Sequence, residues 1–531
     1  MTSWGPLLPH VTVPTPAPGE PGVRAWLRRS ALVVVLAGSL WFLLFESGRP
    51  LPWLDESATM LAIQRPWSGV LALFGGADAP LVPYYLLAKY WAGMLSWLAP
   101  LEAVRGLSAV AAALTVACAY LLVSRYAGLL GGLVSALLLL SLPAFVRFAQ
   151  EARPYALLSL AAAVSWLAWS AWARAATSNQ GWGWQLARAA GYLVTLVAGP
   201  LVSLFAVFQW PAQLLAGLSL PGRSGGGRVR LLAASGGLMI VAGLVTSYPV
   251  LLAATHGTGP AQALALDPLR IINLLGRAII PDPDPSASLL VLALALFGGT
   301  VGALRLWGRS SERELIGLCW WWLVVPMLSS LAVGIWRPGL LQTRYWQPAL
   351  VPLAILAAIG LLATARAAFR LGGRRALGLA LGVALVLAGL SAEAKLVKPT
   401  QVNIRTVGGH DGDLVGLLAV LDPLVAAHPD ALVLNSSART GVALMSVRPG
   451  VAQSNPLLEV SQTSSSIWPT VRAASQLNTV GQQHLRFIWI VGRRDPAAPA
   501  PQAPPSMLHG QGFKVVSTDR SGQWFVMLVQ R

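Results

Sequence analysis

The sequence predicts a polytopic α-helical membrane protein that ends in a small α/β domain. Of its 531 residues, 55% are hydrophobic and only 11% are charged, and the mean hydropathy is +0.62. Soluble domains contain about 25% charged residues, so the composition indicates the membrane class. Apolar runs long enough to cross a hydrocarbon core about 30 Å thick recur from Ser30 to Leu390. From about Lys398 onward, the apolar runs shorten to the length of strands.

Within residues 30–395 we expect about eleven membrane spans, with 11 to 13 possible. The first span covers Ser30 to Ser47, and the polar, proline-rich loop 48–80 follows it on the outside. The run at 188–218 contains two prolines and is longer than one span needs. It predicts a broken or a double crossing, with the run at 81–98 then re-entrant. The later apolar runs lie near residues 81–98, 106–123, 129–147, 155–173, 188–218, 230–252, 286–305, 315–335, 345–365 and 376–392.

Basic residues give the expected orientation of the chain. Residues 1–29 are rich in proline and end in a cluster of arginines before the first span, which predicts a disordered cytoplasmic segment. Basic loops in the second half are expected to be cytoplasmic, so the loops between them and the C-terminal domain are extracytoplasmic. In the first half, simple counting places Arg125 outside and residues 150–155 inside. A site at 150–155 would require the reverse.

The net charge of +18 comes largely from short loops between apolar runs, so we expect membrane lipids and no nucleic acid among the partners. The two cysteines, Cys118 and Cys319, both lie inside apolar runs. This placement excludes a disulfide framework and a cysteine metal cluster. No cofactor is expected, although the external carboxylates leave a divalent cation possible.

The region 396–531 is expected to be an extracytoplasmic α/β domain. A helical pattern from Asp413 to His428 precedes several strand-length runs, and a hairpin is expected at 519–523. No glycine-rich phosphate-binding sequence opens a helix here, so the sequence assigns this domain no chemistry. The expected strands lie at 431–434, 486–491, 513–517 and 524–529.

Asp55 and Glu56 stand just after the first span, at the start of the external loop. A carboxylate at a partly desolvated interface can act as a general base, a role that contributes about 10²- to 10⁴-fold in rate. The alternative is a helix N-terminus, where Asp55 caps the stretch from Glu56 to Ile63 and its charge favours the helix dipole. The residues by themselves leave both interpretations open.

Asp78 lies at the mouth of the 81–98 run, shortly before Tyr84 and Tyr85. The carboxylate is either a third polar group of a site or a plain helix cap. The tyrosines either face a substrate or belong to the aromatic belt at the membrane surface.

Gln150, Glu151, Arg153 and Tyr155 occupy the junction between two apolar runs. A charge at bilayer depth costs about 2.5 to 3.5 kcal/mol on insertion scales, so such groups normally face a cavity or a partner. Either Glu151 and Arg153 pair with each other, or Arg153 holds a phosphate through charge-assisted hydrogen bonds.

His256 and the pair Arg344-Tyr345 are two further candidates in external loops. A lone histidine is weak evidence for a site. Arg344 at the start of a span fits a phosphate clamp, although arginines that extend to the membrane interface are common.

These motifs together resemble GT-C glycosyltransferases. They are the Asp55-Glu56 pair, the entry Asp78-Ala-Pro-Leu-Val-Pro-Tyr-Tyr85, the string Gln150-Glu-Ala-Arg-Pro-Tyr155 and the pair Arg344-Tyr345. The chain looks most similar to family 39 and to bacterial RgtA/B/C/D-like enzymes. These are relatives of the protein O-mannosyltransferases and of the aminoarabinose transferase that modifies lipid A. The resemblance covers roughly residues 30–390, and the 150–155 string is its most specific part.

The resemblance implies inverting transfer of a sugar, often mannose or another hexose or pentose, from a polyprenyl-phosphate donor. The acceptor would be a glycan, lipid or protein of the cell envelope on the extracytoplasmic side. Asp55 would be the general base, and Glu56 and Asp78 would orient the acceptor or the base. Arg153 and Arg344 would stabilise the departing phosphate. The remaining expected substrate-binding residues are Tyr84, Gln150, Glu151, Tyr155, His256 and Tyr345.

Two other classes of protein are alternatives to a glycosyltransferase. A transporter or flippase for a lipid-linked intermediate would also place charges at the membrane boundary. The chain lacks the matching pair of interrupted spans that is typical of inverted repeats. An inactive scaffold subunit with the same membrane domain is the other alternative. Where related enzymes often carry a His-Pro-Pro or lysine-rich element, this chain has Asp78-Ala-Pro80.

Overall fold

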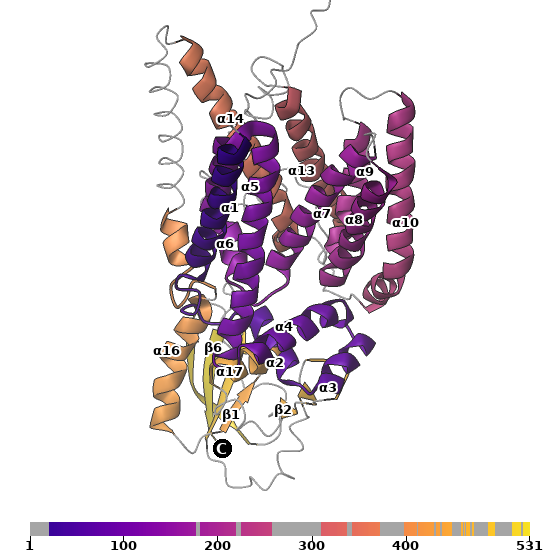
Figure 1. Ribbon diagram of the computed structural model, residues 1–531. Helices are drawn as coiled ribbons and strands as arrows, with labels where there is room; N and C mark the ends of the chain where they lie inside the picture. The colour runs from indigo at the N-terminus through magenta and orange to yellow at the C-terminus, as the bar shows by residue number, and fades with distance from the viewer. Residues whose placement is uncertain are drawn as a thin grey trace, which may run out of the picture.

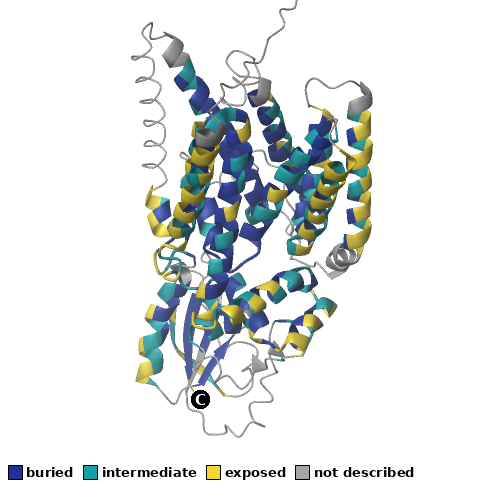
Figure 2. Cartoon of the chain, in the orientation of Figure 1, coloured by how far each residue is buried: buried dark blue, intermediate teal, exposed yellow. Residues whose placement is uncertain are grey.

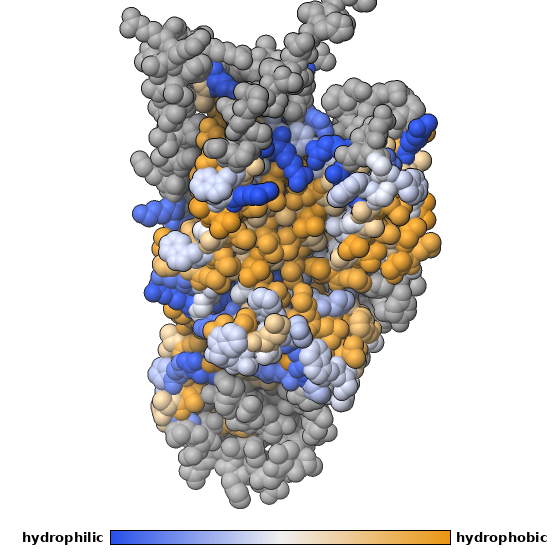
Figure 3. Space-filling view, in the orientation of Figure 1, coloured by the Kyte–Doolittle hydropathy of each residue, from blue (hydrophilic) through white to orange (hydrophobic). Residues whose placement is uncertain are grey.

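The chain folds into a helical bundle with a small sheet domain at one end (Figure 1). The computed structural model describes residues 21–176, 181–218, 225–256, 310–336, 342–371 and, with gaps, 398–530. Within these residues, seven helices are long and apolar enough to cross a membrane. A broad apolar band covers the middle of the bundle surface, as expected for a face in contact with lipid (Figure 3). The predicted runs at 286–305 and 376–392 lie outside the described residues, so the expected total of spans stays a prediction.

The long helix α5 (Pro100–Ser141) folds back on itself at Gly128. This glycine has φ of 83° and ψ of −179°, a region that only glycine adopts without strain. A Cβ atom built on Gly132 would lie 2.8 Å from Cδ2 of Tyr120. Residues twelve apart in a straight helix are separated by about 18 Å. α5 is therefore a helical hairpin, and its two arms confirm the separate runs predicted at 106–123 and 129–147.

The run predicted at 188–218 forms two helical segments with a break between them, and the chain returns after the break to the end at which α8 (Trp182–Val202) begins (Figure 1). Helix α8 ends at Ser203, and the chain continues through the 3₁₀ turn η3 (Leu204–Phe208) into α9 (Gln209–Leu218). Pro211 stands in the first turn of α9, where a missing backbone N–H costs no helical hydrogen bond.

The centre of the bundle is formed by α14 (Gln347–Leu371), which packs against α5 and against α7 (Tyr155–Ala175). Alanines recur along the buried face of α14, and such small residues let helices approach closely in a membrane. By contrast, α1 (Pro21–Leu44) and α10 (Gly225–His256) lie at the periphery and expose many apolar side chains (Figure 2). The remaining elements of the bundle are α6 (Pro143–Ala149), α13 (Ser310–Trp336) and η5 (Thr343–Trp346).

The loop between α1 and α5 forms a layer of short helices across the end of the bundle (Figure 1). The run at 81–98 was expected as a span or a re-entrant segment, and the prediction of a span is wrong. Helix α4 has 13 residues and reaches about 20 Å, which is too short for a crossing of about 30 Å. The layer consists of α2 (Leu54–Gln64), α3 (Trp67–Ala72), η1 (Leu73–Gly75), η2 (Ala79–Leu81) and α4 (Val82–Met94).

Because α4 does not cross, the segments of the first half lie at other ends of the bundle than simple counting gave them. Arg125 lies at the same end of the bundle as Arg28, whose carbonyl accepts a hydrogen bond from Tyr120, and Arg174, which donates to Tyr126. Residues 150–155 lie at the opposite end, beside the sheet domain (Figure 1). Simple counting gave the wrong arrangement because it treated 81–98 as a span.

The C-terminal domain contains a four-stranded sheet with the order β1-β4-β6-β5. β1 pairs with β4 in parallel, and the other pairs are antiparallel. The predicted strands and the terminal hairpin of β5 and β6 are confirmed to within a few residues. α17 was not predicted, and it packs against α2 of the membrane-surface layer. The elements are α16 (Gly412–Ala427), β1 (Leu432–Asn435), α17 (Ala438–Val447), β2 (Leu458–Glu459), β3 (Thr470–Val471), β4 (Phe487–Arg493), β5 (Lys514–Ser521) and β6 (Trp524–Gln530).

Candidate functional site

Asp55 is held between two arginines at the end of the bundle that faces the sheet domain. Its Oδ2 atom lies 2.6 Å from Nη1 of Arg344 and 3.9 Å from Nη2 of Arg153. The side chain of Asp55 is 22% exposed, so the carboxylate is within reach of a ligand. The N-cap of α2 is Trp53, so Asp55 is in the first turn and does not cap the helix. Three charged groups therefore converge at one point of the surface layer.

Arg153 comes from the short turn between α6 and α7, and its side chain is almost fully buried. Its Nη1 donates to the backbone carbonyl of Asp55 at 3.2 Å and to Oγ1 of Thr59 at 3.3 Å. The Nε atoms of Arg153 and Arg344 have no hydrogen-bond partner among the described residues. Both guanidinium groups are thus positioned beside Asp55 with donor capacity to spare.

Glu56, the second expected catalytic residue, does not share the partly exposed position of Asp55. The side chain is fully buried, and Arg105 binds it through two nitrogens at 2.9 and 2.8 Å. Oε1 of Glu56 also accepts the backbone N–H of Ala152 at 2.7 Å. Burial alone would raise the pKa of Glu56, but Arg105 and His410 lower it to about 2. Glu56 therefore links α2 to the turn that carries Arg153, as a positioning residue.

Gln150 and Glu151 also point away from Asp55. Nε2 of Gln150 donates to the carbonyls of Leu43 and Phe45 at 2.8 and 3.1 Å, at the end of α1. Glu151 is fully buried and accepts a hydrogen bond from Arg147 at 2.9 Å. Of the two alternatives for this cluster, the pairing of Glu151 with Arg153 is not the one observed, since Glu151 pairs with Arg147. One oxygen of Gln150 and one of Glu151 have no hydrogen-bond partner among the described residues, so a role of these side chains in substrate binding stays a prediction.

Several buried polar atoms near Arg153 lack partners. Asp78 Oδ2 and the hydroxyl groups of Tyr84, Tyr85 and Tyr155 form no hydrogen bond within the described part of the chain. Burial raises the pKa of Asp78, although Arg153 acts in the opposite direction. Burial likewise raises the pKa of Tyr84 well above its ordinary value. Buried polar groups are normally paired, so this cluster is where a polar ligand would complete the hydrogen bonding.

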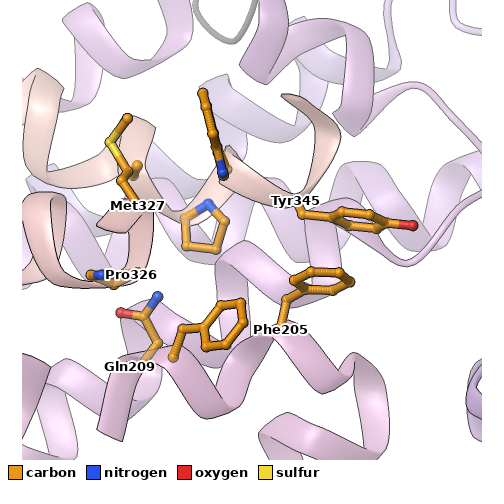
Figure 4. Close-up of a pocket in the computed structure, with 9 residues that line it drawn as sticks. Phe205, Gln209, Pro326, Met327 and Tyr345 are labelled. Carbon is orange, nitrogen blue, oxygen red and sulfur yellow. The ribbon is translucent and has the colours of Figure 1, made fainter. Parts of the chain in front are cut away.

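Tyr345 connects the charged centre to an apolar pocket (Figure 4). Its ring stacks on Phe205 with the centroids 3.7 Å apart and meets Tyr155 edge-on at 6.2 Å. The pocket lies between η3, α9, α13 and the start of α14. Tyr345, one of its lining residues, follows Arg344 directly in the chain. The pocket is lined by Phe205, Phe208, Gln209, Pro326, Met327, Tyr345, Trp346, Pro348 and Ala349.

His256 is the last residue of α10, and its side chain lies outside the described part of the structure. Its expected role in substrate binding therefore stays a prediction. Among the described residues, no group of three histidine, cysteine or acidic side chains is arranged to hold a metal ion.

Sequence reasoning missed three buried charged residues around this centre: Arg65, Arg105 and His410. Arg105 is fully buried and donates to the carbonyls of Ser47 and Pro50 as well as to Glu56. The sequence feature that could have identified Arg105 is its position as a single arginine at the edge of the apolar run at 106–123. No sequence pattern links Arg105 to His410, because 305 positions separate them.

No model of a protein family matches the sequence, and no curated protein matches it. The structure is similar to ArnT from Cupriavidus metallidurans. The apo crystal structure of ArnT matches with a TM-score of 0.53 at 12% identity, over 96% of this chain and 98% of that one. The structure of ArnT bound to undecaprenyl phosphate gives 0.51 at 13% identity, over 95% and 97%. At such low identity the likeness concerns the fold alone: this multi-pass membrane protein has the GT-C glycosyltransferase fold.

Proposed function

We propose that the protein is a membrane glycosyltransferase that uses a polyprenyl-phosphate sugar donor and transfers the sugar with inversion to a cell-envelope acceptor. The observation that carries the proposal is the Asp55 carboxylate, held between Arg344 and Arg153 where the bundle meets its surface layer. A reaction on a lipid-linked donor requires such a boundary, since the prenyl chain must stay in the membrane while the sugar reaches water.

In the proposed reaction, Asp55 removes the proton from an acceptor hydroxyl group. The acceptor oxygen attacks the anomeric carbon, and the bond from that carbon to the phosphate oxygen breaks. The phosphate leaves with the electron pair, so its negative charge grows in the transition state. Arg153 and Arg344 supply fixed positive charge for that group, and stabilisation of this kind is usually the largest contribution to catalysis.

Arg344 is the contact that changes during this cycle. In the structure it binds Asp55 at 2.6 Å, and its Nε has no partner among the described residues. A donor phosphate is a stronger bidentate ligand for a guanidinium group than a single carboxylate oxygen. Donor binding would therefore draw Arg344 towards the phosphate and leave Asp55 free to accept a proton.

The first part of the prenyl chain is proposed to lie at the small apolar pocket beside Tyr345, whose walls would separate to admit it (Figure 4). Tyr345, which lines the pocket, follows Arg344 directly in the chain, so a phosphate on Arg344 and a hydrocarbon at the pocket can belong to one ligand. ArnT, which shares the fold, has been crystallised with undecaprenyl phosphate. The sugar is proposed to be mannose or another hexose or pentose.

The end of the bundle that carries Asp55 is proposed to be extracytoplasmic. The opposite end holds the turn of α5 at Gly128, the end of α7 and the starts of α10 and α13 (Figure 1). These four segments carry Arg125, Arg174, Arg228 and Arg313. Basic residues accumulate on the cytoplasmic side of membrane proteins, which supports the proposal that residues 1–29 are cytoplasmic and the sheet domain is extracytoplasmic.

The test is transfer of radiolabelled sugar from a polyprenyl-phosphate donor by the full chain in nanodiscs, with cell-envelope extract as acceptor. Asp55→Asn removes the base and should lower transfer by about 10²-fold or more. Asp519→Asn is the control, because Asp519 is an exposed aspartate on β5 of the C-terminal sheet.

Normal transfer by Asp55→Asn would remove Asp55 from the mechanism. Absence of donor consumption by the wild-type chain would favour the inactive scaffold. Movement of intact donor across the membrane of a proteoliposome, without consumption, would favour the flippase.

A further inference from the structure

Arg344 is enclosed by three aromatic rings beside Asp55. Its guanidinium carbon lies 5.6 Å from the ring centre of Tyr345, 5.7 Å from that of Trp53 and 5.8 Å from that of Tyr155. Rings at this distance attract a cation and help to hold it in one position. The two tyrosines belong to the sequence motifs, whereas Trp53 is not among the residues that the sequence predicted for the site.

Trp53 is the N-cap of α2, and its side chain turns towards the membrane domain. The indole packs against the hydrophobic core of the bundle, whereas the neighbouring Leu51 and Leu54 pack against the core of the C-terminal domain. The backbone N–H of Trp53 donates to Oε2 of the buried Glu56 at 3.4 Å. The start of α2 is thus anchored on both sides, and the indole is held in a fixed position at the candidate site.

The indole N–H of Trp53 is a buried donor without an acceptor. Its Nε1 atom forms no hydrogen bond with any described residue, and the same holds for the buried Nε atom of Arg344. An unpaired buried donor costs free energy, so folded proteins rarely keep one without a partner. Neither side chain can accept a hydrogen bond. Two such donors close together therefore indicate a ligand that supplies acceptor oxygens.

The charges around these donors favour an anion. Arg153 and Asp55 act on the charge of Arg344. Asp78 and Arg65, whose charges act on each other, adjoin this group. The three arginines carry three positive charges against the two negative charges of the aspartates, so the balance is positive. Burial raises the pKa of Asp78, and protonation of this carboxylate would only enlarge the positive balance.

We propose that Trp53 is a further ligand of the donor phosphate, to which its indole N–H donates beside Arg344. The inference rests on the proposed function and deepens it. A phosphate brings acceptor oxygens only, and hydrogen bonds to a charged acceptor are the strong ones, whereas a sugar hydroxyl group would bring a donor of its own. The proposed reaction already requires Arg344 to turn from Asp55 to the phosphate. That movement would open the contact between the guanidinium group and the indole to a phosphate oxygen.

The experiment measures how two lipids bind to the full chain in nanodiscs: polyprenyl phosphate and the uncharged polyprenol of the same length. Polyprenyl phosphate is the leaving group of the proposed reaction, so neither the sugar nor the acceptor has to be known. Trp53→Phe keeps an aromatic ring against Arg344 but has no N–H. Trp97→Phe is the matched control, because Trp97 follows α4 in the same surface layer and is 74% exposed.

We expect the wild-type chain to bind polyprenyl phosphate about tenfold or more tightly than polyprenol, because only the phosphate engages the charged donors. Trp53→Phe should raise the Kd for polyprenyl phosphate about tenfold, since a hydrogen bond to a charged acceptor is lost. Its Kd for polyprenol should stay within about twofold of the wild-type value, which also shows that the variant is folded. Trp97→Phe should leave both dissociation constants unchanged.

An unchanged Kd for polyprenyl phosphate in Trp53→Phe would overturn the proposal. So would an equal loss of affinity for both lipids, because that result would mean that the indole only packs against its neighbours. Failure of the wild-type chain to prefer polyprenyl phosphate over polyprenol would instead contradict the proposed function, so the two failures are distinguishable.

Discussion

The carboxylate of Asp55 lies 2.6 Å from the guanidinium group of Arg344, although 289 positions separate the two residues in the chain. Asp55 is presented by a short helix of the surface layer, whereas Arg344 precedes the most buried helix of the bundle. The pair therefore forms only when α2 docks on the completed bundle. It also places the proposed base and the proposed phosphate ligand in direct contact.

Arg344→Ala should lower the rate of sugar transfer by about 10²- to 10³-fold, because the variant lacks a hydrogen-bond donor and positive charge that stabilise the leaving phosphate. Arg344→Lys should recover part of the rate, since lysine keeps the charge but not the planar pair of donors. Initial rates at saturating donor give the comparison. Arg448→Ala is the control, because Arg448 pairs with Asp422 on the C-terminal domain at 2.6 Å. A rate within threefold of wild type for Arg344→Ala would contradict the assignment.

Removal of Arg105 should destabilise the protein strongly. Arg105→Gln leaves Glu56 as a buried carboxylate without its cation, and breaking a buried pair in this way typically costs about 3 to 5 kcal/mol. The double variant Glu56→Gln/Arg105→Gln removes both charges and should be more stable than Arg105→Gln alone. Thermal unfolding of the detergent-solubilised chain measures both effects. Equal melting temperatures for the wild type and Arg105→Gln would show that the pair does not hold the layer.

Glu56 predicts how stability depends on pH. Its pKa is lowered from 4.5 to about 2 in the folded chain, so the folded state binds fewer protons than the unfolded state between these values. The contribution of Glu56 is fully present above pH 4.5 and is lost as the pH falls towards 2. One group of this kind contributes a slope of at most about 1.4 kcal/mol per pH unit.

Glu56→Gln should remove that part of the acid sensitivity. The melting temperature of the wild type and of the variant, measured from pH 7 down to the acid limit of solubility, gives the comparison. Parallel curves for the two proteins would contradict a lowered pKa at Glu56.

Gly128→Ala should destabilise the chain by about 1 to 3 kcal/mol, because a side chain is strained at φ of 83° with extended ψ. The hairpin of α5 depends on this turn, so the yield of folded protein should fall as well. Gly93→Ala is the matched control, since Gly93 lies in α4 with open space around its Cα. The measurements are the recovery of folded protein by gel filtration and the temperature of thermal unfolding. Equal results for Gly128→Ala and Gly93→Ala would contradict a glycine-dependent turn at Gly128.

A metal chelator should leave sugar transfer unchanged. Arg153 and Arg344 already provide positive charge where the phosphate is proposed to leave, which is the role that a divalent cation often fills. Transfer is measured with EDTA and then with added Mg²⁺ or Mn²⁺. Loss of transfer that only one of these cations restores would show that a metal takes part.

Local pattern was enough to predict the elements of the C-terminal sheet and the two arms of the α5 hairpin. Strand length, alternation and the 519–523 turn are properties of neighbouring residues, so a window of sequence contains them. The 81–98 run shows where this reasoning stops. Its composition suits a membrane, but α4 ends after 13 residues and packs across the bundle, and only its neighbours decide that.

The sequence by itself determined the membrane class, most helices and the candidate Asp55, because hydrophobic length and the position of a charge after a span are local quantities. Tertiary structure decided which charges meet. It placed Arg344 and Arg153 on Asp55, and it buried Glu56 on Arg105. Composition gives two adjacent carboxylates the same character, whereas burial and the nearest cation give them different roles.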